Sequence, residues 1–257
     1  GNGESWRTVP GLDAGSLFGL AIDDPRRLLW IASGVVDQTP SPEGAFRGLI
    51  ALDLDRLQVI HRLAVEGEGS PADIHVAPDG TVYAADPANG TIWRVGVGDT
   101  VASVIVPPGR FANPQGLVQS LDRRRLYVSD YIHGLAVVDL NSGEIARLAS
   151  DVTTMLDGID GLVRYGDGLI AVQNGTSPRR ILYLALSGDG RRITRVETLE
   201  SAHPDWGEPT LGVVRGNRFL YVADAQWERY GGGGALTGEG PTRPTAIREL
   251  SLRGRNF

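Results

Sequence analysis

The sequence LDGIDGLVRYGDGLIAVQNG, residues 156–175, contains the pattern on which the whole chain is built. It begins with a polar turn, continues as a short apolar strand, reverses at Gly166-Asp167-Gly168 and ends in a second apolar strand, 169–173. Asp-Gly pairs supply the positive φ angles that short hairpin loops need. The stretch therefore predicts a β-hairpin with polar residues at its opening, of which Asp160 is the foremost candidate for chemistry.

The second strand of this hairpin occurs five times along the chain, and four of the five copies carry a central aromatic residue. Successive copies are separated by roughly 43 to 53 residues, the range of β-propeller blades. The copies are LWIAS (29–33), VYAAD (82–86), LYVSD (126–130), LIAVQ (169–173) and LYVAD (220–224).

Each copy has the same neighbours, namely an earlier strand joined by a turn and a later apolar strand. A more polar fourth strand follows in the first four repeats, at 59–63, 103–106, 145–148 and 193–196. Near-continuous apolar strands are expected where both faces are buried, and alternating strands where one face meets water. The pattern predicts an all-β fold, a β-propeller of four-stranded blades with five repeats visible, forming a single domain over residues 1–257.

The two ends of the repeat series leave an alternative open. The fifth repeat lacks a fourth strand, while the chain begins with an unassigned strand-like segment, Glu4–Val9. Either this segment completes the last blade, or it is the end of a further N-terminal blade that is missing in whole or in part. Two long loops, 35–47 and 226–245, occupy the same place in the first and last repeats. Loops of such length are functional covers or disordered segments.

Composition excludes several classes of function. The formal net charge is −6, and no basic stripe is present, so we expect no nucleic-acid partner. The absence of Cys excludes disulfides and thiolate metal sites. No stretch approaches the roughly 20 apolar residues of a membrane span. Because the chain does not begin with Met, we expect a processed or shortened form. We expect a periplasmic or secreted protein, with the cytoplasm as the alternative, because a chain without Cys fits either compartment.

The direction of the strands places two sets of polar residues at one face of the predicted propeller. The turn before each innermost strand and the turn after each second strand lie at the same face, whereas the first hairpins lie at the opposite face. The opening residues are Phe18, Asp73, Gln115, Asp160 and Glu208. The residues after the second strands include Asp130, Gln173, Asn174 and Asp224.

Three carboxylates and one amide in the openings are hard oxygen donors with no Arg among them. Such a set suits Ca²⁺, which takes 6–8 oxygen ligands. The predicted metal ligands are therefore Asp73, Gln115, Asp160 and Glu208. The residues predicted to line the pocket are Asn174, Gln173, Asp130 and Asp224. The alternative is that these residues end strands and bind water in a central channel. Asp is also a good turn residue after the second strands.

Three short motifs carry a family resemblance: PQGL (114–117), IDGL (159–162) and YVAD (221–224). With them, the chain resembles the six-bladed gluconolactonase and senescence-marker-protein family. That family includes luciferin-regenerating enzymes and is related to paraoxonases and strictosidine-synthase-like proteins. The resemblance implies a central divalent cation, usually Ca²⁺, and hydrolysis of a lactone or phosphotriester. It places the family's ligand and catalytic Asp on Asp160, an Asn ligand on Gln115, and a further opening near Asp73. The family's first-blade Glu has no counterpart.

Two further residues complete the predicted site. His133 lies in a hairpin at the same face and is the acid–base partner for Asp160 if no metal binds. Trp227, in the last long loop, is predicted either to roof the pocket or to pack locally. Two functions follow as hypotheses: a metal-dependent hydrolase of a lactone or related ester, and a non-catalytic propeller that binds a small molecule or a protein at this face.

Overall fold

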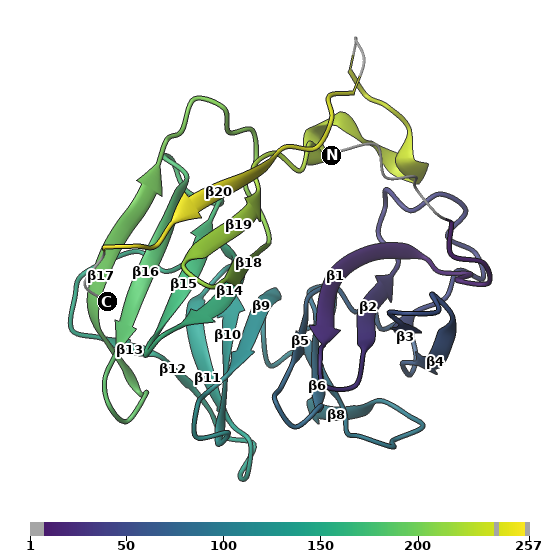
Figure 1. Cartoon of the computed structure of the whole chain (residues 1–257), viewed down its shortest axis with the longest axis horizontal. Helices are drawn as coiled ribbons and strands as arrows, with labels where there is room; N and C mark the ends of the chain where they lie inside the picture. Colours follow the sequence, from purple (N-terminus) through teal and green to yellow (C-terminus); the bar gives the residue numbers. More distant parts are fainter. Residues whose placement is uncertain (1–7, 239–241, 255–257) are drawn as a thin grey trace.

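The computed structural model describes residues 8–238 and 242–254, which form five sheets, all antiparallel except for one short strand in the fourth (Figure 1). The first sheet contains β1 (Ser16–Asp23), β2 (Leu28–Gly34), β3 (Gly48–Asp53) and β4 (Val59–Ala64). The second contains β5 (Ile74–Val76), β6 (Val82–Asp86), β7 (Thr91–Val95) and β8 (Ser103–Val106). The third contains β9 (Pro114–Gln119), β10 (Arg125–Asp130), β11 (Gly134–Asp139) and β12 (Ile145–Arg147).

The fourth sheet contains β14 (Ile159–Tyr165), β15 (Gly168–Gln173), β16 (Arg180–Leu186) and β17 (Arg192–Ser201). A short strand, β13 (Ala149–Ser150), pairs in parallel with β17 at its outer edge. The fifth sheet contains β18 (Gly212–Arg215), β19 (Arg218–Val222) and β20 (Ile247–Ser251). The prediction of a β-propeller with five visible repeats is confirmed.

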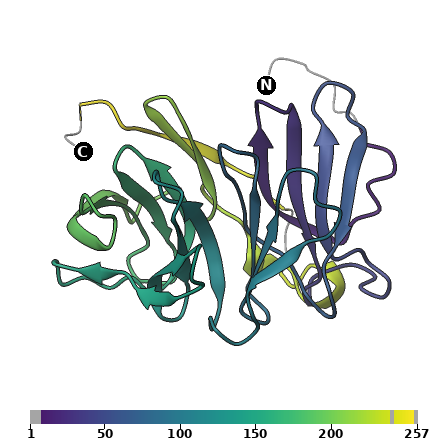
Figure 2. The same ribbon diagram turned by 90° about the horizontal axis from the view of Figure 1, so that it is seen from below.

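The sheets stand around an axis with their first strands innermost (Figures 1 and 2). Contacts run from β1 to β5, β5 to β9, β9 to β14 and β14 to β18. The core lies between the sheets, where apolar side chains of neighbouring blades form shared clusters, such as Trp30 and Leu49 with Val82 and Trp93. All five residues of β6 are buried, because this strand is covered on both faces. The continuous apolar character of the second strands has this origin.

The described part of the fifth blade has three strands, and a break separates it from the first blade (Figure 1). Leu20 on β1 and Val213 on β18 are exposed beside this break. The segment proposed as a closing strand, Glu4–Val9, lies outside the described residues except for its last two, which form no strand. No helix in the described ranges is long and apolar enough to cross a membrane.

The long loop between β19 and β20 crosses the break on one face (Figure 1). It contains two short 3₁₀ helices, η1 (Trp227–Arg229) and η2 (Gly232–Gly234). The N–H of Gly233 donates to the carbonyl of Asp37 at 2.7 Å, which attaches the last blade's loop to the first blade's loop. The two loops that the sequence marks as unusually long are therefore in contact with each other.

Candidate functional site

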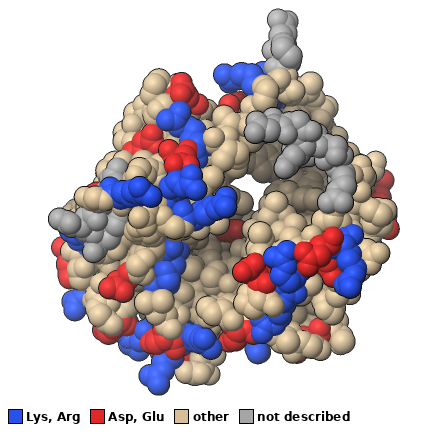
Figure 3. All heavy atoms as spheres, in the orientation of Figure 1, with Lys and Arg blue, Asp and Glu red and all other residues tan. Residues whose placement is uncertain are grey.

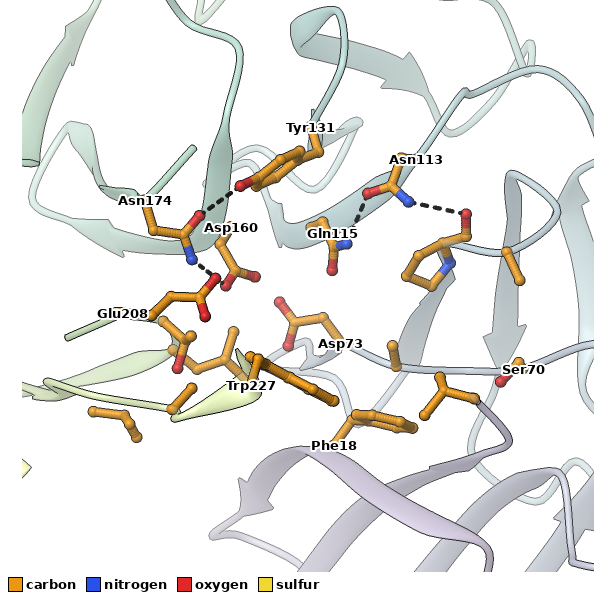
Figure 4. A pocket seen from close by; sticks show the side chains of 18 of the residues that line it. Phe18, Ser70, Asp73, Asn113, Gln115, Tyr131, Asp160, Asn174, Glu208 and Trp227 are labelled. Carbon is orange, nitrogen blue, oxygen red and sulfur yellow. Dashed lines mark hydrogen bonds between the residues drawn. The ribbon is translucent and has the colours of Figure 1, made fainter. Parts of the chain in front are cut away.

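A cavity of about 500 Å³ lies on the axis beneath the loop that crosses the break. Its walls come from all five blades, and the molecule is hollowed at this centre (Figures 3 and 4). The structure brings six of the predicted site residues to it: Asp73, Gln115, Asp160, Asn174, Glu208 and Trp227. The opening residue Phe18 also lines it.

Irregular pairing in the innermost strands directs three of these side chains. The register of β1 with β2 shifts between Leu17 and Leu20, and that of β14 with β15 shifts between Ile159 and Leu162. The register of β9 with β10 shifts at the corresponding place, next to Gln115. Such bulges bend a strand and re-aim a side chain. Phe18, Gln115 and Asp160 each lie at one of these shifts.

A glycine follows each of these three residues because neighbouring strands approach closely there. A Cβ on Gly116 would lie 2.5 Å from the backbone nitrogen of Leu162 and 2.6 Å from the carbonyl oxygen of Asp160. A Cβ on Gly161 would lie 2.8 Å from the carbonyl oxygen of Thr210. These distances leave no room for a side chain, so the small residue permits the ring of innermost strands to close up around the cavity.

A hydrogen-bond network holds Asp160 in place (Figure 4). The Nδ2 of Asn174 donates to Asp160 Oδ2 at 2.9 Å and to the carbonyl of Pro209 at 2.9 Å. The hydroxyl of Tyr131 donates to Asn174 Oδ1 at 2.9 Å. Because a backbone carbonyl only accepts hydrogen bonds, Pro209 fixes which end of the Asn174 amide faces the carboxylate. Asn174 is thus a positioning residue for Asp160.

A second relay orients Gln115 (Figure 4). Asn113 Nδ2 donates to the carbonyl of Pro87 at 3.2 Å, and Gln115 Nε2 donates to Asn113 Oδ1 at 2.8 Å. The Pro87 carbonyl again sets the direction, since it can only accept. The other end of the Gln115 amide, its oxygen Oε1, faces the cavity, and no described group donates a hydrogen bond to this oxygen. The amide therefore presents an acceptor rather than a donor.

Burial, with smaller contributions from neighbouring charges, raises the pKa values of all three carboxylates. Burial raises the pKa of Asp73 to about 7, and the nearby charge of Asp160 adds to the increase. Burial raises the pKa of Asp160 to about 6, with Glu208 adding and the Asn174 hydrogen bond opposing. Burial also raises the pKa of Glu208, although Arg179 opposes that shift. No Arg or His is among the described residues that line the cavity.

The donor chemistry of this cluster fits a hard cation. Four side chains turn oxygen atoms toward a common centre, namely those of Asp73, Gln115, Asp160 and Glu208 (Figure 4). A divalent cation would stabilise the ionised carboxylates, which burial and neighbouring negative charges disfavour. In the described ranges no three acidic or histidine side chains lie close enough to form a metal site by themselves. A bound cation would therefore take its ligands from two carboxylates, the Gln115 amide oxygen and water.

Three predicted pocket residues lie outside the cavity lining and bond to backbone instead. Gln173 Nε2 donates to the carbonyls of Met155 and Asp157. Asp130 accepts from the N–H groups of Ala112 and Asn113. Asp224 accepts from those of Glu208 and Gln226. These side chains join the end of a second strand to the opening of the first strand in the same blade, so their role in the structure is to hold the openings in position.

His133 lies in a different place from Asp160. It lines a separate cavity of about 270 Å³ with Leu135, Leu148 and Met155, and its Nδ1 lies 3.2 Å from Asp130 Oδ2. Asp160 does not line that cavity. The pairing of His133 with Asp160, expected if no metal binds, is not formed.

The residues that orient Asn174 and Gln115, namely Tyr131 and Asn113, were not predicted. Tyr131 directly follows the end of β10, as Asn174 directly follows the end of β15, so the repeat alignment contained a signal for it. Asn113 immediately precedes β9, outside the opening motif itself. Its role depends on a contact with Pro87 of the neighbouring blade, which no local pattern predicts.

The comparisons with known proteins agree with the fold. A family model described as strictosidine synthase-like, N-terminal, matches residues 55–95, which run from the first blade through β7 and include Asp73. No curated protein sequence matches the chain.

Two solved structures are similar to this one. A chain of a crystallised nidogen/laminin complex has a TM-score of 0.59 at 19% identity, covering 84% of this chain and 74% of that one. A structural genomics protein of unknown function from Bacteroides thetaiotaomicron has a TM-score of 0.59 at 13% identity, covering 80% of this chain. The match spans about half of that protein, 52%. These findings agree with the β-propeller fold and do not single out the gluconolactonase family.

Proposed function

We propose that the chain is a gluconolactonase-like hydrolase that opens a lactone or a related ester at a divalent-cation site, with Ca²⁺ as the cation. The observation that carries the proposal is the cluster of Asp73, Gln115, Asp160 and Glu208, which presents acceptor oxygens and no basic partner to one cavity. Hydrolases of this kind need a charge that polarises a carbonyl and a base that activates water. The cluster offers the residues for both.

Asp160 is the proposed general base. Its Oδ2 is occupied by Asn174, which leaves Oδ1 for a water molecule in the cavity. A pKa of about 6 keeps the carboxyl ionised at neutral pH and makes it a stronger base than an exposed aspartate. Holding the carboxylate in one orientation lowers the entropic cost of reaching the reactive geometry.

In the proposed reaction, Asp160 accepts a proton from water as the water oxygen bonds to the carbonyl carbon of the ester. The bond between that carbon and the alkoxy oxygen then breaks, and the proton passes from Asp160 to the departing oxygen. The products are a carboxylic acid and an alcohol, joined in one molecule when the substrate is a lactone. A bound cation would polarise the carbonyl and lower the pKa of the water. Asp73, Asp160 and Gln115 Oε1 would hold it.

The test is hydrolysis of a panel of lactones and esters by the Ca²⁺-loaded protein and its Asp160→Asn variant. We expect the variant to lose about 10²–10⁴-fold in kcat, because the base is removed while the shape is kept. Asp167→Asn changes a hairpin at the opposite face and serves as the control with unchanged activity. Full activity in Asp160→Asn would contradict the assignment of the base.

A second candidate is a non-catalytic propeller that binds an organic cation in the same cavity. The observation in its favour is that Phe18 and Trp227 stack beside the carboxylates, with ring centroids 6.3 Å apart and planes 16° apart. Aromatic faces and carboxylates together bind ammonium groups. Competition separates the two candidates: an alkylammonium salt that binds in the presence of saturating Ca²⁺, with no ester hydrolysed, would favour the second.

A further inference from the structure

The cavity has two different sides. The polar side is formed by the third, fourth and fifth blades (Figure 4). Its residues are Tyr131, Asp160, Asn174 and Glu208. The opposite side is mainly apolar and comes from the first and second blades, with Trp227 of the crossing loop, although Asp73 also belongs to the second blade. Its residues are Leu17, Phe18, Val36, Pro87, Ala88 and Trp227. Leu211, Val222 and Ala225 of the fifth blade add further apolar surface to the cavity. A ligand that fills the cavity therefore meets oxygen atoms on one side and hydrocarbon on the other.

The apolar side is built around the stacked rings of Phe18 and Trp227, which lie next to each other along the cavity (Figure 4). They come from opposite ends of the chain, β1 and η1. Trp227 is 41% exposed although the hydrogen bond of Gly233 to Asp37 attaches its loop to the first blade. Aromatic surface held in position and still open to solvent is a site where a flat apolar group gains binding free energy.

The polar groups on this side are already hydrogen-bonded within the protein. The Ser70 hydroxyl donates to the carbonyl of Val35 at 2.9 Å and accepts from the N–H of Val35 at 2.8 Å. Asn113 uses its amide on Pro87 and Gln115. A ligand with hydroxyl groups on every side would lose hydrogen bonds to water here and find few protein groups to replace them, which is unfavourable.

We propose that the substrate of this site is amphipathic, an ester or lactone that carries a flat apolar ring, rather than a polyhydroxylated sugar lactone. The ring lies against Phe18 and Trp227, and the carbonyl faces Asp73, Gln115 and Asp160. The ester part of this inference rests on the proposed function, whereas the ring part rests on the two walls of the cavity.

The experiment compares three lactones that share one six-membered ester ring: dihydrocoumarin, with a fused benzene ring, δ-valerolactone, with no substituent, and glucono-δ-lactone, with hydroxyl groups. We expect kcat/KM on the Ca²⁺-loaded protein to be highest for dihydrocoumarin and lowest for glucono-δ-lactone. Trp227→Ala is expected to lower kcat/KM for dihydrocoumarin about tenfold more than for δ-valerolactone. Leu236→Ala, on the same loop and outside the cavity lining, is the matched control.

A binding measurement separates the two proposals. The lactam analogue of dihydrocoumarin has the same shape and resists hydrolysis, so calorimetry reports its binding without catalysis. Binding that weakens about tenfold in Trp227→Ala, with no lactone hydrolysed, supports the ring site and overturns the proposed hydrolase. Hydrolysis of glucono-δ-lactone at a kcat/KM equal to or above that of dihydrocoumarin, with no effect of Trp227→Ala on the preference, overturns the ring site and keeps the hydrolase.

Discussion

At the scale of single residues, the candidate site depends on which side-chain donors and acceptors bond within the protein and which remain available to a ligand. Two backbone carbonyls, of Pro87 and Pro209, accept from Asn113 and Asn174 and thereby fix the direction of both amides. The consequence is an inner surface of oxygen acceptors formed by Asp73, Gln115 and Asp160. Without a cation, this surface is electrostatically unfavourable, which is why burial and mutual repulsion raise the carboxyl pKa values.

Asp73 gives a prediction for stability against pH. Its folded-state pKa of about 7 lies above the ordinary value, so its contribution to the free energy of unfolding is full below about pH 4 and is lost as the pH rises through 7. In chelator, urea unfolding should therefore show Asp73→Asn to be more stable than the unsubstituted protein at pH 8, by on the order of 1 kcal/mol, and not at pH 4.

Asp79→Asn is the matched control for this measurement. The pKa of Asp79 is lowered, chiefly by the hydrogen bond from the Thr81 N–H, so its ionised form is favourable in the fold. This variant should gain no stability at pH 8. If Asp73→Asn and the unsubstituted protein lose stability with pH in parallel, Asp73 does not carry the raised pKa.

Much of the residue-level site follows from sequence, and the limits have physical causes. Strand direction alone places Asp73, Gln115, Asp160 and Glu208 at one face, because openings of equivalent strands share a face. It does not show which polar side chains are used by nearby backbone. Gln173 and Asp130 are used in that way, whereas Asn174 reaches the cavity. Whether a side chain turns inward depends on tertiary contacts between blades.

At the scale of elements, the innermost strands combine a bulge with a glycine. The bulge directs Gln115 and Asp160 inward, and the following glycine allows the next strand to approach. The glycines are visible in the repeated opening motif, but the register shifts are not, since hairpin signals predict regular pairing. The blades themselves were predictable because their second strands are short apolar segments that recur at a regular spacing.

Gly116 provides the test of this arrangement. In Gly116→Ala the new Cβ meets backbone atoms of Asp160 and Leu162 at 2.6 and 2.5 Å, so β9 and β14 must separate. We expect a loss of about 1–3 kcal/mol in the free energy of unfolding, with weaker Ca²⁺ binding as Asp160 moves. Gly188→Ala is the control, because Gly188 has open space around its Cβ position. Equal stability of the two variants in denaturant titrations would contradict the close packing of these strands.

At the scale of the whole molecule, the described blades form an incomplete ring whose break is crossed by the loop between β19 and β20 (Figure 1). This loop brings Trp227 over the cavity and contacts the first blade through Gly233 and Asp37. The sequence shows that both loops are unusually long, but it does not predict their contact. The loops belong to the first and last blades and meet only because the fold brings these two blades to either side of the break. The cavity on the axis and the crossing loop lie at one face, which carries the candidate site.

The central claim is that the oxygen cluster on this axis binds a divalent cation, and titration of Ca²⁺ into chelator-stripped protein tests it most directly. Calorimetry at pH 8 should show saturable binding of one ion with a rise in Tm, and the affinity should fall at pH 5, where the carboxyls of Asp73 and Asp160 are protonated. Asp160→Asn should weaken binding, and Asp167→Asn should not. No heat of binding, together with a Tm that neither Ca²⁺ nor chelator changes, would contradict the account.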